Sequence, residues 1–278
     1  MMHATLSRIC AGDYDSFFLI AGPCVVESYE VCAEVADQLK SLCVSLDLPL
    51  VFKASLKKAN RTSLHSFYSI GEEDALEILG RIKQDFDLAI TTDVHETTDM
   101  SLIEDIVDLI QIPAFLCRQT DLLVSAGSTD LPVNIKKGQF ATASTMIHAV
   151  EKVRSGRSDL HPKTDDVFLT ERGFSHGYHD LVVDPKSLAA MSASTPTIID
   201  ITHANQKPNQ AGGVTTGSSD SAELLARVGL VSGVTGLFLE THPDPSVALS
   251  DGATMIALHQ VGDMLKRLKA LSIALRSI

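Results

Sequence analysis

The chain has 278 residues, 45% of them hydrophobic, and a mean hydropathy of +0.14, which is enough to bury a core and too mixed for a membrane protein. No apolar stretch reaches the roughly 18 to 20 residues that span a bilayer, and the first residues lack a basic segment followed by an apolar one. The 23 Lys and Arg against 35 Asp and Glu give a formal charge of −12, which would repel DNA. We therefore expect a soluble, cytoplasmic protein that binds neither a membrane nor nucleic acid.

Short apolar runs recur along the chain, and segments with helical periodicity separate most of them. The clearest helical segment is 29–46, where Val31, Val35, Leu39, Leu42 and Leu46 fall on one face at spacings of three and four. The apolar runs are continuous rather than alternating, which is typical of buried parallel strands. In chain order we predict strand 17–20, helix 29–46, strand 50–52, helix 73–86, strands 89–91, 109–112 and 133–135, helix 142–153, strands 167–169 and 197–199, helix 221–228, strand 237–239 and helix 257–275.

Eight strand-like runs in fewer than 280 residues favour an α/β fold of the (β/α)8 barrel type over an open doubly wound sheet. The first run ends in Ala21-Gly22-Pro23-Cys24 and carries no GxGxxG string, so dinucleotide binding is disfavoured. No linker-like segment divides the chain. We predict one barrel domain over residues 1–278, in which 1–16 form an N-terminal extension.

Reactive side chains follow each of the predicted strands. The carboxyl ends of barrel strands meet at one mouth, where active sites of this fold lie, so these side chains are expected to converge there. They are Cys24, Glu27, Lys53, Ser55, Lys58, Asn60, Arg61, Asp93, His95, Glu96, Gln111, Arg118, Lys136, Lys137, Glu171, Arg172, Asp200, His203, Glu240 and His242.

The cations in this set stand out in an acidic chain. Arg grips phosphate or carboxylate with paired hydrogen bonds and Lys supplies a compact charge, so their convergence predicts a doubly anionic or two-phosphate set of substrates. The alternative is a set of surface salt bridges, although Lys53 would be partly buried and costly without a partner. The cations are Lys53, Lys58, Arg61, Arg118, Lys136 and Arg172.

Cys24, His203, Glu240 and Asp251 form a second set, which barrel closure would bring together. A thiolate, an imidazole and two carboxylates suit a divalent transition metal such as Zn, Fe or Mn. Alone, a Cys after a strand is more often a packed apolar residue, so both readings stay open on this evidence. The five cysteines show no paired finger spacing, and we expect reduced thiols.

Ten strings between Phe17 and Leu258 together resemble the family of 3-deoxy-D-manno-octulosonate 8-phosphate synthases. The related heptulosonate 7-phosphate synthases typically carry Lys-Pro-Arg where this chain has Lys58-Ala59-Asn60-Arg61, so the octulosonate family is favoured. The strings are Ala21 to Cys24, Phe52 to Ser55, Lys58 to Ser63, Thr92 to Glu96, Gln111 to Phe115, Arg118 to Leu122, Asn134 to Lys137, Thr170 to Gly173, Asp200 to His203 and Glu240 to Pro243.

The resemblance implies a condensation of phosphoenolpyruvate with arabinose 5-phosphate and water in lipopolysaccharide sugar biosynthesis. Lys53, Ser55, Lys58, Gln111, Lys136 and Arg172 would hold phosphoenolpyruvate, and Asn60, Arg61 and Thr62 the pentose phosphate, with Arg118 completing a phosphate pocket. Lys58, Asp93, His203 and Asp251 would be catalytic. Family members are homotetramers, and the loop with Phe115 and Arg118 would reach a neighbouring barrel.

The family has a metal-dependent and a metal-free branch, which carry Cys or Asn at the position of Cys24. Cys24 therefore implies the metal-dependent branch, with Cys24, His203, Glu240 and Asp251 as ligands of a divalent ion. Two departures bear on the substrate loops. Lys57 stands where the family usually has Asp, and residues 215–220 lack the Arg of the family's Gly-Gly-x-Arg string.

Overall fold

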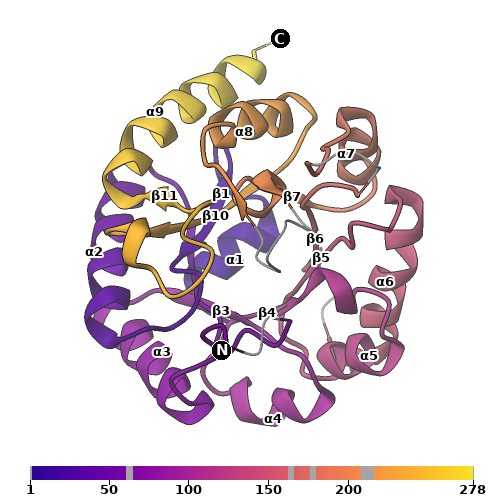
Figure 1. Ribbon diagram of the computed structural model, residues 1–278. Helices are drawn as coiled ribbons and strands as arrows, with labels where there is room; N and C mark the ends of the chain where they lie inside the picture. Colours follow the sequence, from indigo (N-terminus) through magenta and orange to yellow (C-terminus); the bar gives the residue numbers. More distant parts are fainter. Residues whose placement is uncertain (1, 61–64, 162–165, 176–179, 208–215, 278) are drawn as a thin grey trace.

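Residues 2–60, 65–161, 166–175, 180–207 and 216–277 are described by a computed structural model of the chain, and they confirm the predicted (β/α)8 barrel. The strands run parallel in the order β1-β2-β3-β4-β5-β6-β7-β10, and pairing of β1 with β10 closes the ring (Figure 1). The barrel strands are β1 (Phe18–Gly22), β2 (Leu50–Lys53), β3 (Ala89–Asp93), β4 (Leu109–Ile112), β5 (Val133–Lys136), β6 (Val167–Glu171), β7 (Thr197–Asp200) and β10 (Gly236–His242).

Helices surround the strands, and the five predicted from periodicity are present within a few residues of their expected limits. These are α2 (Tyr29–Ser45), α3 (Glu72–Phe86), α6 (Ala143–Gly156), α8 (Ala222–Val231) and α9 (Leu258–Leu275). The structure adds the shorter helices α1 (Ala4–Ala11), α4 (Met100–Ile103), α5 (Thr120–Ser128) and α7 (Pro185–Ser192), which span too few turns for a 3.6-residue period to stand out.

Several strands continue past the predicted apolar run to the first charged side chain. β3 ends on Asp93, β5 on Lys136, β6 on Glu171 and β7 on Asp200. The backbone ladder does not depend on side-chain polarity, so a strand can end on a charged residue that faces the barrel mouth. The chemistry predicted to follow the strands therefore lies partly on their last residues, where the sheet holds it rigidly.

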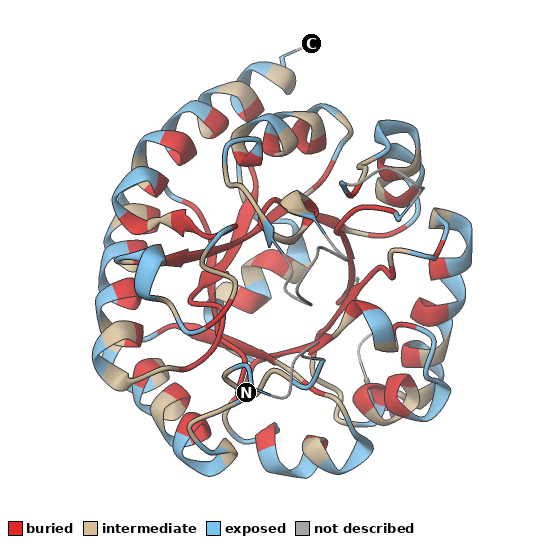
Figure 2. Cartoon of the chain, in the orientation of Figure 1, coloured by how far each residue is buried: buried red, intermediate tan, exposed pale blue. Residues whose placement is uncertain are grey.

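The core has two layers, on the two sides of the strands. Outward-facing strand residues such as Leu19 pack against the buried faces of the surrounding helices, and Figure 2 shows those faces turned toward the barrel. Inward-facing residues form a separate cluster inside the barrel, where Phe18 and Phe168 meet edge to face with ring centroids 5.6 Å apart. Leu6 and Ile9 of α1 complete this inner cluster. The N-terminal extension is therefore a plug at the amino-terminal end of the strands.

Short strands and 3-10 turns lie in the loops at the mouth of the barrel. A hairpin of β8 (Gln206–Lys207) and β9 (Thr216–Gly217) follows β7, and β11 (Ile256–Ala257) extends the sheet beside β10. In the described part of the chain, 3-10 turns lie in the loops after β3, β4, β7 and β10: η1 (Thr97–Asp99), η2 (Ala114–Leu116), η3 (His203–Asn205) and η4 (Pro245–Val247). No helix in the described part of the chain is long and apolar enough to cross a membrane.

Candidate active site

A cavity of about 720 Å³ opens at the carboxyl ends of the barrel strands. Most of the predicted substrate-binding and catalytic residues line it. They are Lys53, Ser55, Lys58, Asn60, Asp93, Gln111, Lys136, Arg172, His203 and Asp251. Arg61 and Thr62 lie outside the described residues. Arg118 is exposed and does not line the cavity of its own chain; its carbonyl oxygen accepts a hydrogen bond from Lys152 Nζ at 3.0 Å.

Lys53 and Glu240 form a buried ion pair at the floor of the cavity. Lys53 Nζ lies 2.9 Å from Glu240 Oε1, and the two side chains are 2% and 0% exposed. Lys53 Nζ also donates to the carbonyl oxygen of Cys24 at 3.1 Å and to Ser55 Oγ at 3.0 Å. A buried ammonium is tolerated only when such partners surround it, so the cation predicted from the Phe52-Lys53-Ala54 string is held as a fixed positive charge.

Lys136, Asp200 and His203 form a second buried group across β5 and β7. Lys136 Nζ lies 2.6 Å from Asp200 Oδ2 and 3.6 Å from the centroid of the Phe238 ring. The same Asp200 oxygen is 2.7 Å from His203 Nδ1. Burial lowers the pKa of Lys136, whereas His203 and Lys136 together hold the pKa of Asp200 below its usual range despite its burial. Asp200 is therefore an ionised carboxylate that orients both a cation and an imidazole.

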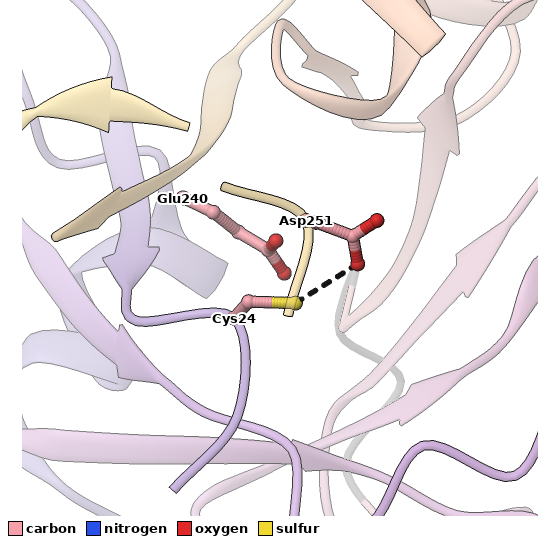
Figure 3. A group of neighbouring side chains, drawn as sticks. All are labelled: Cys24, Glu240 and Asp251. Carbon is pink, nitrogen blue, oxygen red and sulfur yellow. Dashed lines mark hydrogen bonds between the residues drawn. The ribbon is translucent and has the colours of Figure 1, made fainter. Parts of the chain in front are cut away.

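Cys24, Glu240 and Asp251 form a cluster in which the three ligand atoms lie within 4.8 Å of one another (Figure 3). Cys24 Sγ lies 3.1 Å from Asp251 Oδ2, and the hydroxyl of Ser250 lies 2.9 Å from the sulfur. Burial, followed by the charge of Glu240, raises the pKa of the Cys24 thiol well above its ordinary value. The cluster combines the thiol of Cys24, just after β1, with two carboxylates, one from β10 and one from the loop after η4.

His203 borders this cluster without being one of its three members. Its Nε2 atom lies 3.5 Å from Glu240 Oε2, a buried oxygen with no hydrogen-bond partner among the described residues. Its Nδ1 atom faces Asp200. One ring nitrogen held by a carboxylate while the other points at acidic ligands is the arrangement usual for a metal-binding histidine.

Asp251 has a left-handed backbone, with φ of 50°. A side chain other than Gly in this region is uncommon and is often found at functional sites. Its carbonyl accepts the backbone N–H of Thr254 at 3.0 Å, and Glu27 Oε1 accepts the N–H of Leu249 at 2.9 Å. These contacts tie the Asp251 loop to the segment that follows Cys24, so ligands far apart in sequence are kept together.

Lys58 and Asp93 also line the cavity. Lys58 Nζ donates to Ser55 Oγ at 3.1 Å. Burial alone would lower the pKa of Lys58, but the acidic side chains around it, first Cys24 and Glu240, raise it above its usual value. Burial likewise fails to raise the pKa of Asp93, because a hydrogen bond from His95 and the charge of Lys53 lower it. Lys58 is thus a persistent cation and Asp93 a persistent anion.

Arg172 and Asp251 are connected by a residue that the sequence prediction missed. Arg172 Nη2 donates to Gln206 Oε1 at 2.6 Å, and Gln206 Nε2 donates to Asp251 Oδ1 at 3.2 Å. Ser250 was missed as well, whereas His95, which was expected at the mouth without an assigned role, lines the cavity. A Gln or Ser in a loop has no chemical signature of its own, and the position three residues after His203 was the single available clue to Gln206.

Comparison with known proteins adds independent information. A profile of the DAHP synthetase I family matches residues 1–277. A Wolinella succinogenes protein named 2-dehydro-3-deoxyphosphooctonate aldolase is 46% identical over 259 residues, which are 91% of this chain and 98% of that protein. Proteins of the same name from Desulfotalea psychrophila (43% over 263 residues, 94% of this chain and 92% of that protein) and a Cyanothece species (42% over 265 residues, 95% of each) are similar over nearly their full lengths.

Proposed function

The chain belongs to the DAHP synthetase I family, and from this premise we propose that it condenses phosphoenolpyruvate with D-arabinose 5-phosphate and water. The products are 3-deoxy-D-manno-octulosonate 8-phosphate and inorganic phosphate, in lipopolysaccharide sugar biosynthesis. The name carried by the relatives supports this carbon–carbon bond-forming reaction. The observation that carries the proposal is one cavity in which buried cations meet the Cys24, Glu240 and Asp251 cluster.

Phosphoenolpyruvate carries a phosphate and a carboxylate, and its proposed site is the side of the cavity with Lys53, Lys58, Lys136 and Arg172. Ser55 and Gln111 add polar contacts. The raised pKa of Lys58 means that it binds as a cation instead of removing a proton. Lys53, Lys58 and Lys136 are already desolvated and held by partners, so they act on developing charge without reorganisation.

The bond changes follow from holding the two substrates in contact. Carbon three of the enol attacks the aldehyde carbon of the pentose, whose oxygen takes up a proton and becomes a hydroxyl. Water adds to carbon two, where positive charge develops, and the carbon–oxygen bond to phosphate then breaks to leave the ketone. Positioning three reactants supplies much of the acceleration. We assign Lys58, Asp93, His203 and Asp251 to this chemistry.

The residues present fit a divalent metal ion. Cys24, Glu240 and Asp251 offer one ligand atom each within 4.8 Å, and Glu240 Oε2 has a free lone pair beside His203 Nε2. We propose that these four residues hold the ion. When bound, it supplies Lewis acidity toward the aldehyde or the attacking water. The thiolate favours softer ions and the carboxylates harder ones, so Zn, Fe and Mn all match the donor set.

The choice of sugar is tested by a direct comparison of substrates. Phosphate release is measured with phosphoenolpyruvate and either arabinose 5-phosphate or erythrose 4-phosphate. Arabinose 5-phosphate is expected to react, with the octulosonate product identified by mass spectrometry. Reaction with erythrose 4-phosphate alone would favour a heptulosonate synthase, and binding without turnover would make the chain a sugar-phosphate-binding barrel.

We also propose that the protein is a cytoplasmic homotetramer. Phe115 and Phe140, on the loops after β4 and β5, are 56% and 58% exposed. Arg118 is exposed on the same β4 loop. Burial of this face against another barrel would explain both features. Light scattering at micromolar concentration measures the state, and a stable, fully active monomer would contradict it.

A further inference from the structure

Gln206 lies between Arg172 and Asp251, two side chains to which the proposed function gives different roles. Arg172 belongs to the phosphoenolpyruvate side of the cavity, and Asp251 belongs to the metal cluster. Gln206 contacts both, at 2.6 Å through Oε1 and at 3.2 Å through Nε2.

The chemistry of the two partners fixes the orientation of this amide. A guanidinium has donors and no acceptor, and an ionised carboxylate has acceptors and no donor. A side chain that joins them must accept at one end and donate at the other. The amide of Gln206 does so, and its oxygen must face Arg172, so the assignment of O and N does not depend on an arbitrary flip.

The backbone around Gln206 is closely packed. Gln206 begins β8 directly after η3, which carries His203, and its partner across the hairpin is Gly217. A Cβ on Gly217 would lie 2.6 Å from the carbonyl oxygen of Asn205 and 2.3 Å from the methyl of Thr254. This close approach fixes the base of the Gln206 side chain, which leaves the amide with little freedom to leave either partner.

From this geometry we propose that Gln206 is a positioning residue that couples phosphoenolpyruvate binding to metal binding. The inference rests on the proposed function. An anion that fixes Arg172 also fixes Gln206, and Gln206 then holds Asp251 Oδ1 while leaving Oδ2 facing Cys24. The second ligand therefore orders fewer groups when it binds, which gives positive cooperativity in both directions.

The coupling is measured without turnover, by leaving out the pentose phosphate. Cd²⁺ is titrated with and without saturating phosphoenolpyruvate, and the ultraviolet absorbance of its bond to the Cys24 thiolate reports binding. Calorimetry gives the phosphoenolpyruvate dissociation constant with and without saturating Cd²⁺. For the natural protein we expect each ligand to tighten the other by about tenfold, with equal factors in the two experiments.

Gln206→Met keeps the length of the side chain and removes both hydrogen bonds. Its coupling factor should fall to the small value left by attraction between the ion and the anion. Gln206→Glu keeps an acceptor for Arg172 and loses the donor to Asp251, so it should bind phosphoenolpyruvate and still lose the coupling. Lys207→Met, at an exposed neighbour paired with Asp180 at 3.3 Å, disturbs the same hairpin and should behave as the natural protein.

The outcomes separate the inference from the proposed function. A natural protein that binds neither phosphoenolpyruvate nor Cd²⁺ refutes the proposed function, and the inference with it. Independent binding of both ligands refutes the inference alone. So does a full coupling factor in Gln206→Met, or an equal loss of coupling in Lys207→Met.

Discussion

The two ends of the barrel are built from the same strands and have opposite interiors. At the amino-terminal end, Leu6 and Ile9 of α1 close an apolar cluster with Phe18 and Phe168. At the carboxyl end, the strands finish on buried charges around a cavity of about 720 Å³. The amino-terminal end is a packed apolar core, and the carboxyl end holds desolvated charges at the mouth, where active sites of this fold lie.

Each end also contains a buried guanidinium, which makes the contrast testable. Arg157 lies near the amino-terminal end, where Nη2 is 3.0 Å from Asp166 Oδ2 and Nη1 donates to the carbonyl oxygen of Leu131 at 2.6 Å. Arg172 lies in the mouth, where its Nη1 is a buried atom with no hydrogen-bond partner among the described residues. Arg157 Nε is likewise a buried atom with no hydrogen-bond partner among the described residues, so the two guanidinium groups differ in their location. Arg172 lines the cavity, where a ligand can reach an unsatisfied donor, and Arg157 does not line it.

Loss of the metal cluster should have the largest effect on activity. Cys24→Ala removes the thiolate ligand, and prolonged chelation removes the ion, so both should abolish turnover while the fold remains. Added divalent ions should restore the chelated natural protein and leave Cys24→Ala inactive. Metal content by atomic absorption and the rate of phosphate release measure these results.

Cys24→Asn sharpens the same test, because an amide can hydrogen-bond where the thiolate would coordinate. Residual activity of this variant in the presence of a chelator would mean that it works without a metal ion, as the metal-free branch does. The metal site would be wrong if the untreated natural protein contained no stoichiometric metal and kept its activity after chelation. Cys24 would then be only a packed thiol.

Arg157→Ala should have the largest effect on stability. It removes the guanidinium from the buried Asp166 carboxylate, which keeps a contact with His161 Nε2 at 2.9 Å. Breaking a buried ion pair costs about 3 to 5 kcal/mol in free energy of unfolding. The KM for phosphoenolpyruvate should stay unchanged, because the pair lies far from the mouth. Denaturant unfolding at one fixed protein concentration, combined with steady-state kinetics, checks both statements. A raised KM for phosphoenolpyruvate with an unchanged free energy of unfolding would contradict separate roles for the two ends of the barrel.

Leu6→Ala tests the plug itself. Leu6 is fully buried, and its truncation leaves a cavity against the inner cluster, which costs about 2 to 5 kcal/mol. Catalysis at 25 °C should persist, since no cavity-lining residue is in the cluster. Thermal unfolding followed by circular dichroism measures the loss. Ile273→Ala, at a half-exposed position of α9, is the matched control and should cost far less.

The sequence predicted the two ends unequally. The strands were recognisable because β2 and its neighbours are continuous apolar runs, and long helices such as α2 show clear periodicity. The plug was not, because α1 has little more than two turns and its packing partners come from strands spread over the whole chain. Only closure of the barrel brings those strands around Leu6.

Some residues of the candidate site were likewise predictable from the sequence, and others were not. Charged residues at strand ends are predictable because position and chemistry coincide, as at Lys136. Asp251 lies well beyond β10 in a loop; the sequence grouped it with the other acidic and thiol side chains, and the resemblance to the family then favoured a metal site over a packed thiol. Gln206 was missed because its role depends on two partners at once. The predicted place of Arg118 in a phosphate pocket stays a prediction, since it does not line the cavity of its own chain.

Arg172→Ala should have the smallest effect of the series and the most specific one. The loss of a charge-assisted contact to a bound anion costs roughly 1.5 to 3 kcal/mol, which is about tenfold to a hundredfold in phosphoenolpyruvate affinity. Stability should change little or even rise, because burial of this guanidinium is unfavourable, as the lowered pKa of Arg172 indicates. Calorimetric titration with each substrate separates the two affinities. The variant should keep an intact circular dichroism spectrum. Equal loss of affinity for phosphoenolpyruvate and for arabinose 5-phosphate would then contradict the assignment of Arg172 to the phosphoenolpyruvate site. It would also contradict the different roles of the two buried guanidinium groups.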